Sequence, residues 1–144
     1  MQRSLYATIA RLLGGPAAAL PLVLSVSGSA RADAPPPQLD VDMRCKVEGT
    51  AVVCHVTAKP SILAHVTYAR VDLVQAPPFL KVVVGSVDYS DSRDKQQRLN
   101  LAFIAKRGGT GDIVAKVQAM VCADDGSSCP ALSRAVTARV KVGP

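Results

Sequence analysis

The chain has few aromatic residues, which excludes several kinds of binding surface. Among its 144 residues there are no tryptophans, three tyrosines and two phenylalanines. Proteins that bind single-stranded nucleic acid stack bases on aromatic side chains along a positively charged groove. Here the basic residues beyond the N-terminal segment are scattered along the chain rather than clustered. We therefore expect no nucleic-acid partner.

Motifs typical of hydrolases, metalloenzymes and nucleotide-binding proteins are also missing. The sequence contains no nucleophile elbow, no H-E-x-x-H run and no calcium-binding loop. The glycine-rich residues 108–112 precede a predicted strand rather than a helix, so they are predicted to be a turn and not a phosphate-binding loop. His55 and His65 are isolated in the sequence and are expected to be surface or hydrogen-bonded residues rather than catalytic bases. We expect neither a metal site nor a cofactor.

Acidic residues are absent before Asp33, and this N-terminal stretch has the features of an export signal. It begins with positive charge, continues with an apolar run at residues 12–26, and has the small residues that a signal peptidase needs at residues 30–32. A membrane anchor is the alternative, but a spanning helix needs about 20 predominantly apolar residues. This run is shorter and contains two glycines and two prolines, and no cysteine lies near the cleavage point. Residues 1–32 are therefore predicted to be a cleavable signal peptide, and the mature protein is expected to be periplasmic or secreted with no membrane anchor.

Removal of this signal peptide lowers the net charge. The full chain has 17 basic and 11 acidic residues, and three of the arginines lie in residues 1–32, which leaves a net charge of +3 on 112 residues. A chain of this length forms one domain with a modest core, to which cross-links add stability.

Alternating apolar and polar residues predict strands throughout the mature chain. Residues 33–38 are rich in proline and are expected to form an extended lead. Beyond them, the alternation predicts seven strands: residues 39–47, 51–58, 65–74, 79–87, 98–105, 112–121 and 134–142. Because no helical pattern appears, residues 39–144 are predicted to form an all-β, immunoglobulin-like antiparallel sandwich of about seven strands, with a small barrel as the alternative. Residues 88–97 are the longest polar connection and are predicted to be a solvated turn.

Four cysteines in an exported chain are expected to form two disulfides. Cys45 and Cys54 flank a predicted two-residue turn at Gly49 and Thr50, with glycine first as in a type II′ turn. Counting back from this turn places the two cysteines opposite each other as a non-hydrogen-bonded pair, with a Cα separation of roughly 4.5 Å, which a disulfide tolerates. Both fall on the apolar face, which predicts a buried structural disulfide, with buried free thiols as the alternative.

Cys122 and Cys129 bracket a loop of turn-forming residues at the tip of the last predicted hairpin. The alternation places Cys122 in the same row as Lys116, on the less buried face of its strand. A disulfide across this tip would be accessible to the thiolate of another protein, as thiol–disulfide exchange requires. Asp124 and Asp125 would raise the pKa of a nearby thiol, and Lys116 would offset this effect. These residues alone are compatible with an exchanging disulfide and with a permanent one.

Residues 111–142 resemble the last two strands of the N-terminal periplasmic domain of DsbD, the thiol:disulfide interchange protein. The shared pattern is a strand that ends in cysteine, an acidic turn with a glycine, a second cysteine followed by proline, and a closing strand. The matching residues in this chain are Cys122, Asp124, Asp125, Gly126, Cys129 and Pro130. The resemblance implies an immunoglobulin-like fold with Cys122 and Cys129 as a redox pair. It also implies two kinds of partner, a membrane electron donor and a thioredoxin-like periplasmic protein.

Two functions of different classes follow from the sequence. The first is thiol–disulfide exchange by a DsbD-like N-terminal domain. The alternative is a non-catalytic, immunoglobulin-like structural or protein-binding module that two disulfides stabilise. The fold does not decide between them, because function depends on the chemistry of the site.

Overall fold

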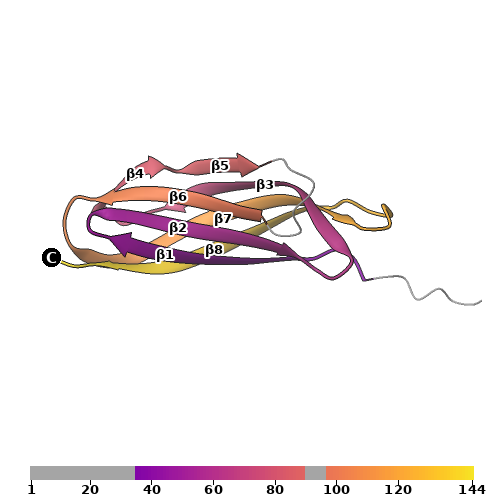
Figure 1. Ribbon diagram of the computed structural model, residues 1–144, viewed down its shortest axis with the longest axis horizontal. Coiled ribbons are helices and arrows are strands. Elements are labelled where there is room, and N and C mark those ends of the chain that lie inside the picture. The colour runs from indigo at the N-terminus through magenta and orange to yellow at the C-terminus, as the bar shows by residue number, and fades with distance from the viewer. Residues whose placement is uncertain (1–34, 90–96) are drawn as a thin grey trace, which may run out of the picture. The chain divides into compact units, whose positions relative to one another are not determined.

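The computed structural model describes residues 35–89 and 97–144 (Figure 1). All described strands belong to one compact unit, Ala34–Pro144. The predicted signal peptide, residues 1–32, lies outside the described residues, as does most of the predicted polar turn at residues 88–97. Within the described part of the chain, no helix is long and apolar enough to cross a membrane.

In the described residues, eight strands build two antiparallel sheets. In chain order they are β1 (Leu39–Glu48), β2 (Ala51–Pro60), β3 (Ala64–Gln75), β4 (Leu80–Val84), β5 (Ser86–Tyr89), β6 (Gln97–Ala105), β7 (Gly109–Ala123) and β8 (Ala131–Val142). One sheet has the strand order β1-β2-β6-β4 and the other β5-β3-β7-β8. This is the ABED and CFG order of immunoglobulin-like sandwiches, with β5 as an added edge strand. The structure confirms the predicted all-β, immunoglobulin-like fold.

One predicted strand, residues 79–87, is two strands in the structure. β4 pairs with β6, whereas β5 pairs with β3 in the other sheet, so the chain changes sheets at Gly85. A Cβ at Gly85 would lie 3.0 Å from Cγ1 of Val82, and the Gly85 carbonyl accepts a hydrogen bond of 2.7 Å from the Leu73 amide. The three valines of β4 continue the strand pattern up to this glycine, which is why the change of sheet is not visible in the sequence.

The core between the sheets is almost entirely aliphatic. The inward row predicted for β7 is buried along its whole length, and it consists of Ile113, Ala115, Val117, Ala119 and Val121. Because the chain has no tryptophan, Phe103 of β6 is the largest fully buried side chain among the described residues. The core therefore has two buried aromatic rings among the described residues, those of Phe79 and Phe103, and Phe103 is the more deeply buried.

The hairpin of β1 and β2 has the register predicted from its turn. Gly49 adopts a φ of 61° in this turn, a left-handed conformation that glycine adopts without strain. Cys45 pairs with Cys54, and the two form a disulfide with a Cα–Cα distance of 3.9 Å. Cys54 is fully buried and Cys45 is half-buried. This disulfide therefore faces the interior of the sandwich.

A Gly109→Ala substitution is expected to destabilise the protein at the start of β7. A Cβ at this position would lie 2.6 Å from Cδ1 of the buried Phe79 ring, so the ring or the strand must move, and overpacking of this kind costs about 1–3 kcal/mol. Gly143→Ala is the matched control, because a Cβ there meets nothing within 4 Å, and it should change the free energy of unfolding by less than about 0.5 kcal/mol. Urea unfolding measures both. Equal stabilities would contradict the contact between Phe79 and β7.

Candidate functional site

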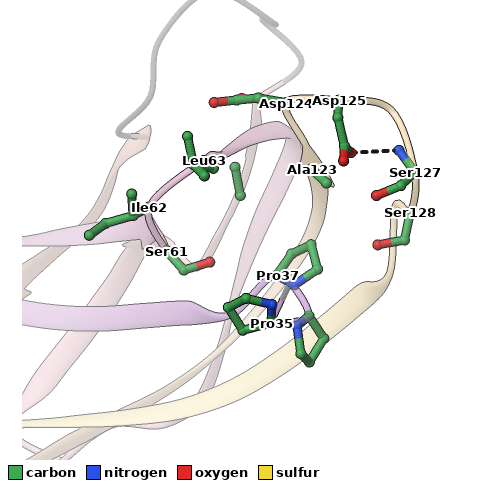
Figure 2. A pocket seen from close by; sticks show the side chains of 12 residues that line it. Pro35, Pro37, Ser61, Ile62, Leu63, Ala123, Asp124, Asp125, Ser127 and Ser128 are labelled. Carbon is green, nitrogen blue, oxygen red and sulfur yellow. Dashed lines mark hydrogen bonds between the residues drawn. The ribbon is translucent and has the colours of Figure 1, made fainter. Parts of the chain in front are cut away.

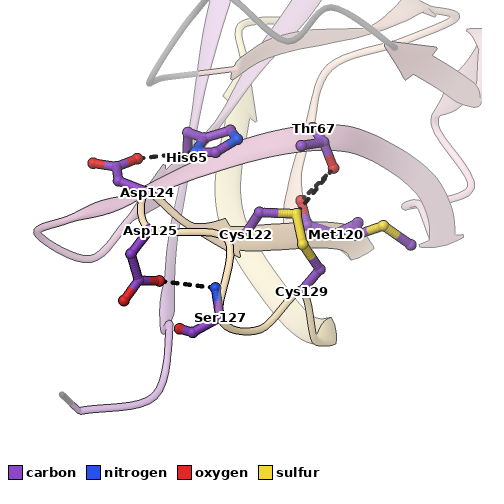
Figure 3. The surroundings of a disulfide bond; sticks show 8 residues. All are labelled: His65, Thr67, Met120, Cys122, Asp124, Asp125, Ser127 and Cys129. Atoms are coloured by element: carbon purple, nitrogen blue, oxygen red, sulfur yellow. Dashed lines mark hydrogen bonds and ion pairs between the residues drawn. A yellow bond between two sulfur atoms is a disulfide. The ribbon is translucent and has the colours of Figure 1, made fainter. Parts of the chain in front are cut away.

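The second disulfide lies at the tip of the β7–β8 hairpin (Figure 3). Two backbone hydrogen bonds extend the ladder beyond the paired strands: Val121 donates to the carbonyl of Pro130 at 3.1 Å, and Ala123 donates to that of Ser128 at 2.9 Å. Cys122 and Cys129 are therefore opposite each other at a non-hydrogen-bonded position, where the two backbones approach most closely. They form a disulfide with a Cα–Cα distance of 4.0 Å. Both disulfides of the protein thus join neighbouring strands of a hairpin.

Local hydrogen bonds hold the turn between the two cysteines. The Gly126 amide donates to the carbonyl of Ala123 at 2.9 Å, and Gly126 has a φ of 73°, which favours glycine at this position. The carboxylate of Asp125 accepts a hydrogen bond of 2.9 Å from the Ser127 amide, a typical Asx turn. Hydrogen bonds from Ser127 hold the pKa of Asp125 below its usual value, so this carboxyl is ionised at neutral pH.

The two cysteines differ in exposure, in a way that the sequence pattern did not predict. Cys122 was placed on the less buried face of β7, and Met120 in the same row is 43% exposed. Cys122 itself is only 8% exposed, whereas Cys129 is exposed. Cys122 does lie in the predicted row, opposite His65 of β3, but its expected exposure was wrong, because its disulfide partner and β3 lie against it. The bridge therefore presents one of its two cysteines to solvent.

Strand β3 supplies two polar side chains beside the bridge. Thr67 lies at a bulge in the pairing of β3 with β7, and bulges of this kind redirect a side chain. Its hydroxyl donates to the Met120 carbonyl at 3.3 Å and lies 3.9 Å from Sγ of Cys122. His65 is the direct cross-strand neighbour of Cys122, and its Nδ1 lies 2.9 Å from Oδ1 of Asp124 (Figure 3).

Both histidines are hydrogen-bonded, as predicted, since His55 also lies 2.7 Å from the side chain of Asn100. The sequence analysis did not anticipate the position of His65 beside Cys122. The only signal that points to it is the expected pairing of β3 with β7 in an immunoglobulin-like sandwich, and that pairing does not specify the register.

Lys116 does not neutralise the acidic turn. It shares a strand face with Cys122 but lies six residues earlier, opposite Asp72, which corresponds to a separation of about 20 Å along a strand. The sequence-based expectation that Lys116 offsets the charge of Asp124 and Asp125 is therefore wrong. The charged groups in the turn itself are these two aspartates, one of which is bonded to His65.

The described residues contain no group of three or more His, Cys, Asp or Glu side chains that could hold a metal ion. A disulfide that faces solvent on one side can react with an incoming thiolate without a metal or a cofactor. The chemistry available to this site is therefore the opening and closing of the Cys122–Cys129 bond. A comparison with protein-family models finds no match to this chain, and a comparison with curated proteins finds none either.

Proposed function

We propose that this protein is an exported redox module that exchanges the Cys122–Cys129 disulfide with the thiols of a thioredoxin-like protein. The observation that carries the proposal is the unequal exposure of the bridge, with Cys129 exposed and Cys122 8% exposed. The resemblance of residues 111–142 to the N-terminal domain of DsbD supports the same reaction and a periplasmic location. The electron donor is then a membrane protein or another thiol protein of that compartment.

The reaction begins at the exposed sulfur. A partner thiolate attacks Sγ of Cys129 and forms a mixed disulfide, while the bond between the two cysteines breaks and its electron pair leaves on Sγ of Cys122. A second thiolate of the partner then attacks its own sulfur in the mixed disulfide and releases Cys129. This domain gains two electrons and two protons, and the partner becomes a disulfide. The reverse sequence passes the electrons on to another disulfide.

Two features around Cys122 act in opposite directions on the thiolate that leaves when the bridge opens. The Thr67 hydroxyl is 3.9 Å from its sulfur and is able to donate to the sulfur once the bridge opens. The two nearby aspartates, by contrast, disfavour the negative charge that the leaving sulfur acquires, and the described residues contain no helix whose N-terminus would stabilise a thiolate. The site therefore supports passive exchange, in which the partner supplies the nucleophile.

The alternative function is a structural or protein-binding module in which both disulfides are permanent. Two observations favour it: both bridges occupy the same cross-strand position of a hairpin, and Cys122 is nearly buried. The two functions make different predictions about the reduction potential of the second bridge.

Reduction of the folded protein should open Cys122–Cys129 before Cys45–Cys54. The expected potential of the tip bridge is above about −300 mV, the value below which structural disulfides of secreted proteins fall. Titration with defined ratios of reduced and oxidised dithiothreitol, followed by alkylation and mass mapping, measures each bridge separately. The Cys45–Cys54 bridge, with its fully buried Cys54, is the internal control. A tip bridge that opens only together with the control, or only below this potential, would exclude the exchange function.

A further inference from the structure

A groove of about 400 Å³ lies beside the β7–β8 hairpin loop (Figure 2). Three segments line it: the prolines of residues 35–37, the turn between β2 and β3 at residues 61–64, and the hairpin loop at residues 123–128. We refer to it as the tip groove. Its volume falls within the range of sites that bind small molecules or short peptide segments, about 300–1,000 Å³.

The turn between β2 and β3 presents two apolar side chains at this groove. Ile62 is 93% exposed and Leu63 is 71% exposed, which makes them the most exposed large hydrophobic residues in the described part of the chain. Leu63 also adopts a φ of 62°, a conformation that is rare and costly for a residue with this side chain. Its carbonyl accepts a hydrogen bond of 2.8 Å from the Asp124 amide. The strained turn is therefore tied to the hairpin loop that contains the bridge.

The charge around the tip groove has one sign. Asp124 and Asp125 are the ionisable residues that line it, and none of its described lining residues carries a positive charge. The amide and side chain of Ser127 stabilise the ionised form of Asp125. A bound segment that combines apolar and basic side chains would therefore be complementary to this groove in apolar surface and in charge.

The tip groove and the bridge share the hairpin loop. Five of the residues that line the groove lie between Cys122 and Cys129 in the chain, namely Ala123, Asp124, Asp125, Ser127 and Ser128. Cys122 and Cys129 do not line the groove, because their side chains alternate with those of Ala123 and Ser128 and project from the other face of the hairpin. A polypeptide whose cysteine is bonded to Cys129 therefore reaches the groove around the edge of the loop, with residues a few positions away from that cysteine.

We propose that the tip groove binds the segment next to the reactive cysteine of the thiol partner, and that it selects segments with apolar and basic residues. This inference rests on the proposed exchange function and adds the specificity of the partner. Ile62 and Leu63 supply apolar contacts, and the two aspartates attract lysine or arginine.

Three short peptides test this specificity without any exchange reaction. Each has serine in place of the reactive cysteine: one has leucine and lysine as neighbours, one has leucine and glutamate, and one has serine and lysine. NMR titration of the folded, oxidised protein should show the tightest binding for the leucine–lysine peptide, with shifts at residues 61–64 and 123–128. An Ile62→Ser variant should weaken that binding about fivefold or more, as truncation of a central interface residue does.

Val74→Ser is the matched control. Val74 is 63% exposed and lies ten residues beyond Ala64 on the same strand, about 30 Å from the groove. This variant should bind the leucine–lysine peptide as tightly as the unmodified protein. A Leu63→Gly variant, which also relieves the positive φ, should retain the fold and lose affinity.

Equal binding of the three peptides, or equal losses in Ile62→Ser and Val74→Ser, would overturn the proposed specificity. The exchange function is tested separately, by measuring the rate at which reduced glutathione opens the Cys122–Cys129 bridge. That rate should be unchanged by Ile62→Ser, since glutathione has no apolar or basic neighbours to place in the groove. A bridge that never reacts with glutathione or with the cysteine form of the leucine–lysine peptide would contradict the exchange function, even if the serine peptide binds as expected.

Discussion

A Cys122→Ser variant is expected to capture a partner that carries a disulfide, as a mixed disulfide on Cys129, whereas a Cys129→Ser variant is expected to capture very little. The first variant keeps the exposed cysteine and removes the one that would release the partner. The second keeps a cysteine that is 8% exposed in the native fold. A local opening that costs only about 1.4 kcal/mol slows the reaction of a buried group about tenfold, so we expect a difference in trapping of about that size or larger.

Incubation with a thioredoxin-like protein that lacks its second cysteine and carries a small leaving thiol on the first, followed by non-reducing electrophoresis and mass spectrometry, measures this difference. The two variants are matched, because each has lost the same bridge and each retains Cys45–Cys54. Equal trapping by both variants would show that the unequal exposure does not direct the attack. Preferential trapping by Cys129→Ser would assign the attacked sulfur to Cys122 and reverse the order of steps proposed above.

A Phe103→Ala variant is expected to lose about 3–5 kcal/mol of the free energy of unfolding, the usual cost of removing a buried aromatic ring. Phe103 is 1% exposed, and it lies opposite Val52 of β2 and Val82 of β4 in the register of its sheet. The chain has only one other phenylalanine and no tryptophan to occupy the vacated space. A loss of this size is a large part of the stability of a small domain, about 5–15 kcal/mol.

Ile104→Ala is the control for this prediction. It removes an aliphatic side chain from the next position of β6, where the side chain is 46% exposed on the opposite face, and should cost less than about 1 kcal/mol. Urea unfolding monitored by circular dichroism, with both disulfides oxidised, compares the variants. Similar losses at both positions would contradict the assignment of the two faces of β6.

The fold could be predicted from the sequence because its signals are local. Alternation marks the strands, and the glycine of the first turn sets the register that places Cys45 opposite Cys54. The burial of Cys122 depends instead on contacts between segments that are distant in the chain. His65 and Asp124 are 59 residues apart, and Thr67 reaches Cys122 only because β3 has a bulge there. The alternation of apolar and polar residues along the chain carries no information about such contacts.

The tip groove could not be predicted for a related reason. It combines the proline-rich lead, a turn whose Leu63 has a positive φ, and the hairpin loop. In the sequence, Ile62 and Leu63 lie between two predicted strands, residues 51–58 and 65–74, and their exposure follows from the direction in which the chain turns. A leucine in a left-handed conformation is not expected from its residue type. The structure is therefore needed to recognise this part of the candidate site.

The tip bridge closes a span of only seven residues, and a loop of that size contributes roughly 2.5 kcal/mol by restricting the unfolded chain. Twelve residue pairs join β7 to β8 below it, and the inward side chains of β7 are buried in the core between the sheets, on the face opposite to Cys122. Opening of the Cys122–Cys129 bond at the end of this hairpin is therefore expected to leave the pairing of β7 with β8 intact. If the bridge exchanges as proposed, the protein is therefore expected to pass through repeated oxidation and reduction without refolding.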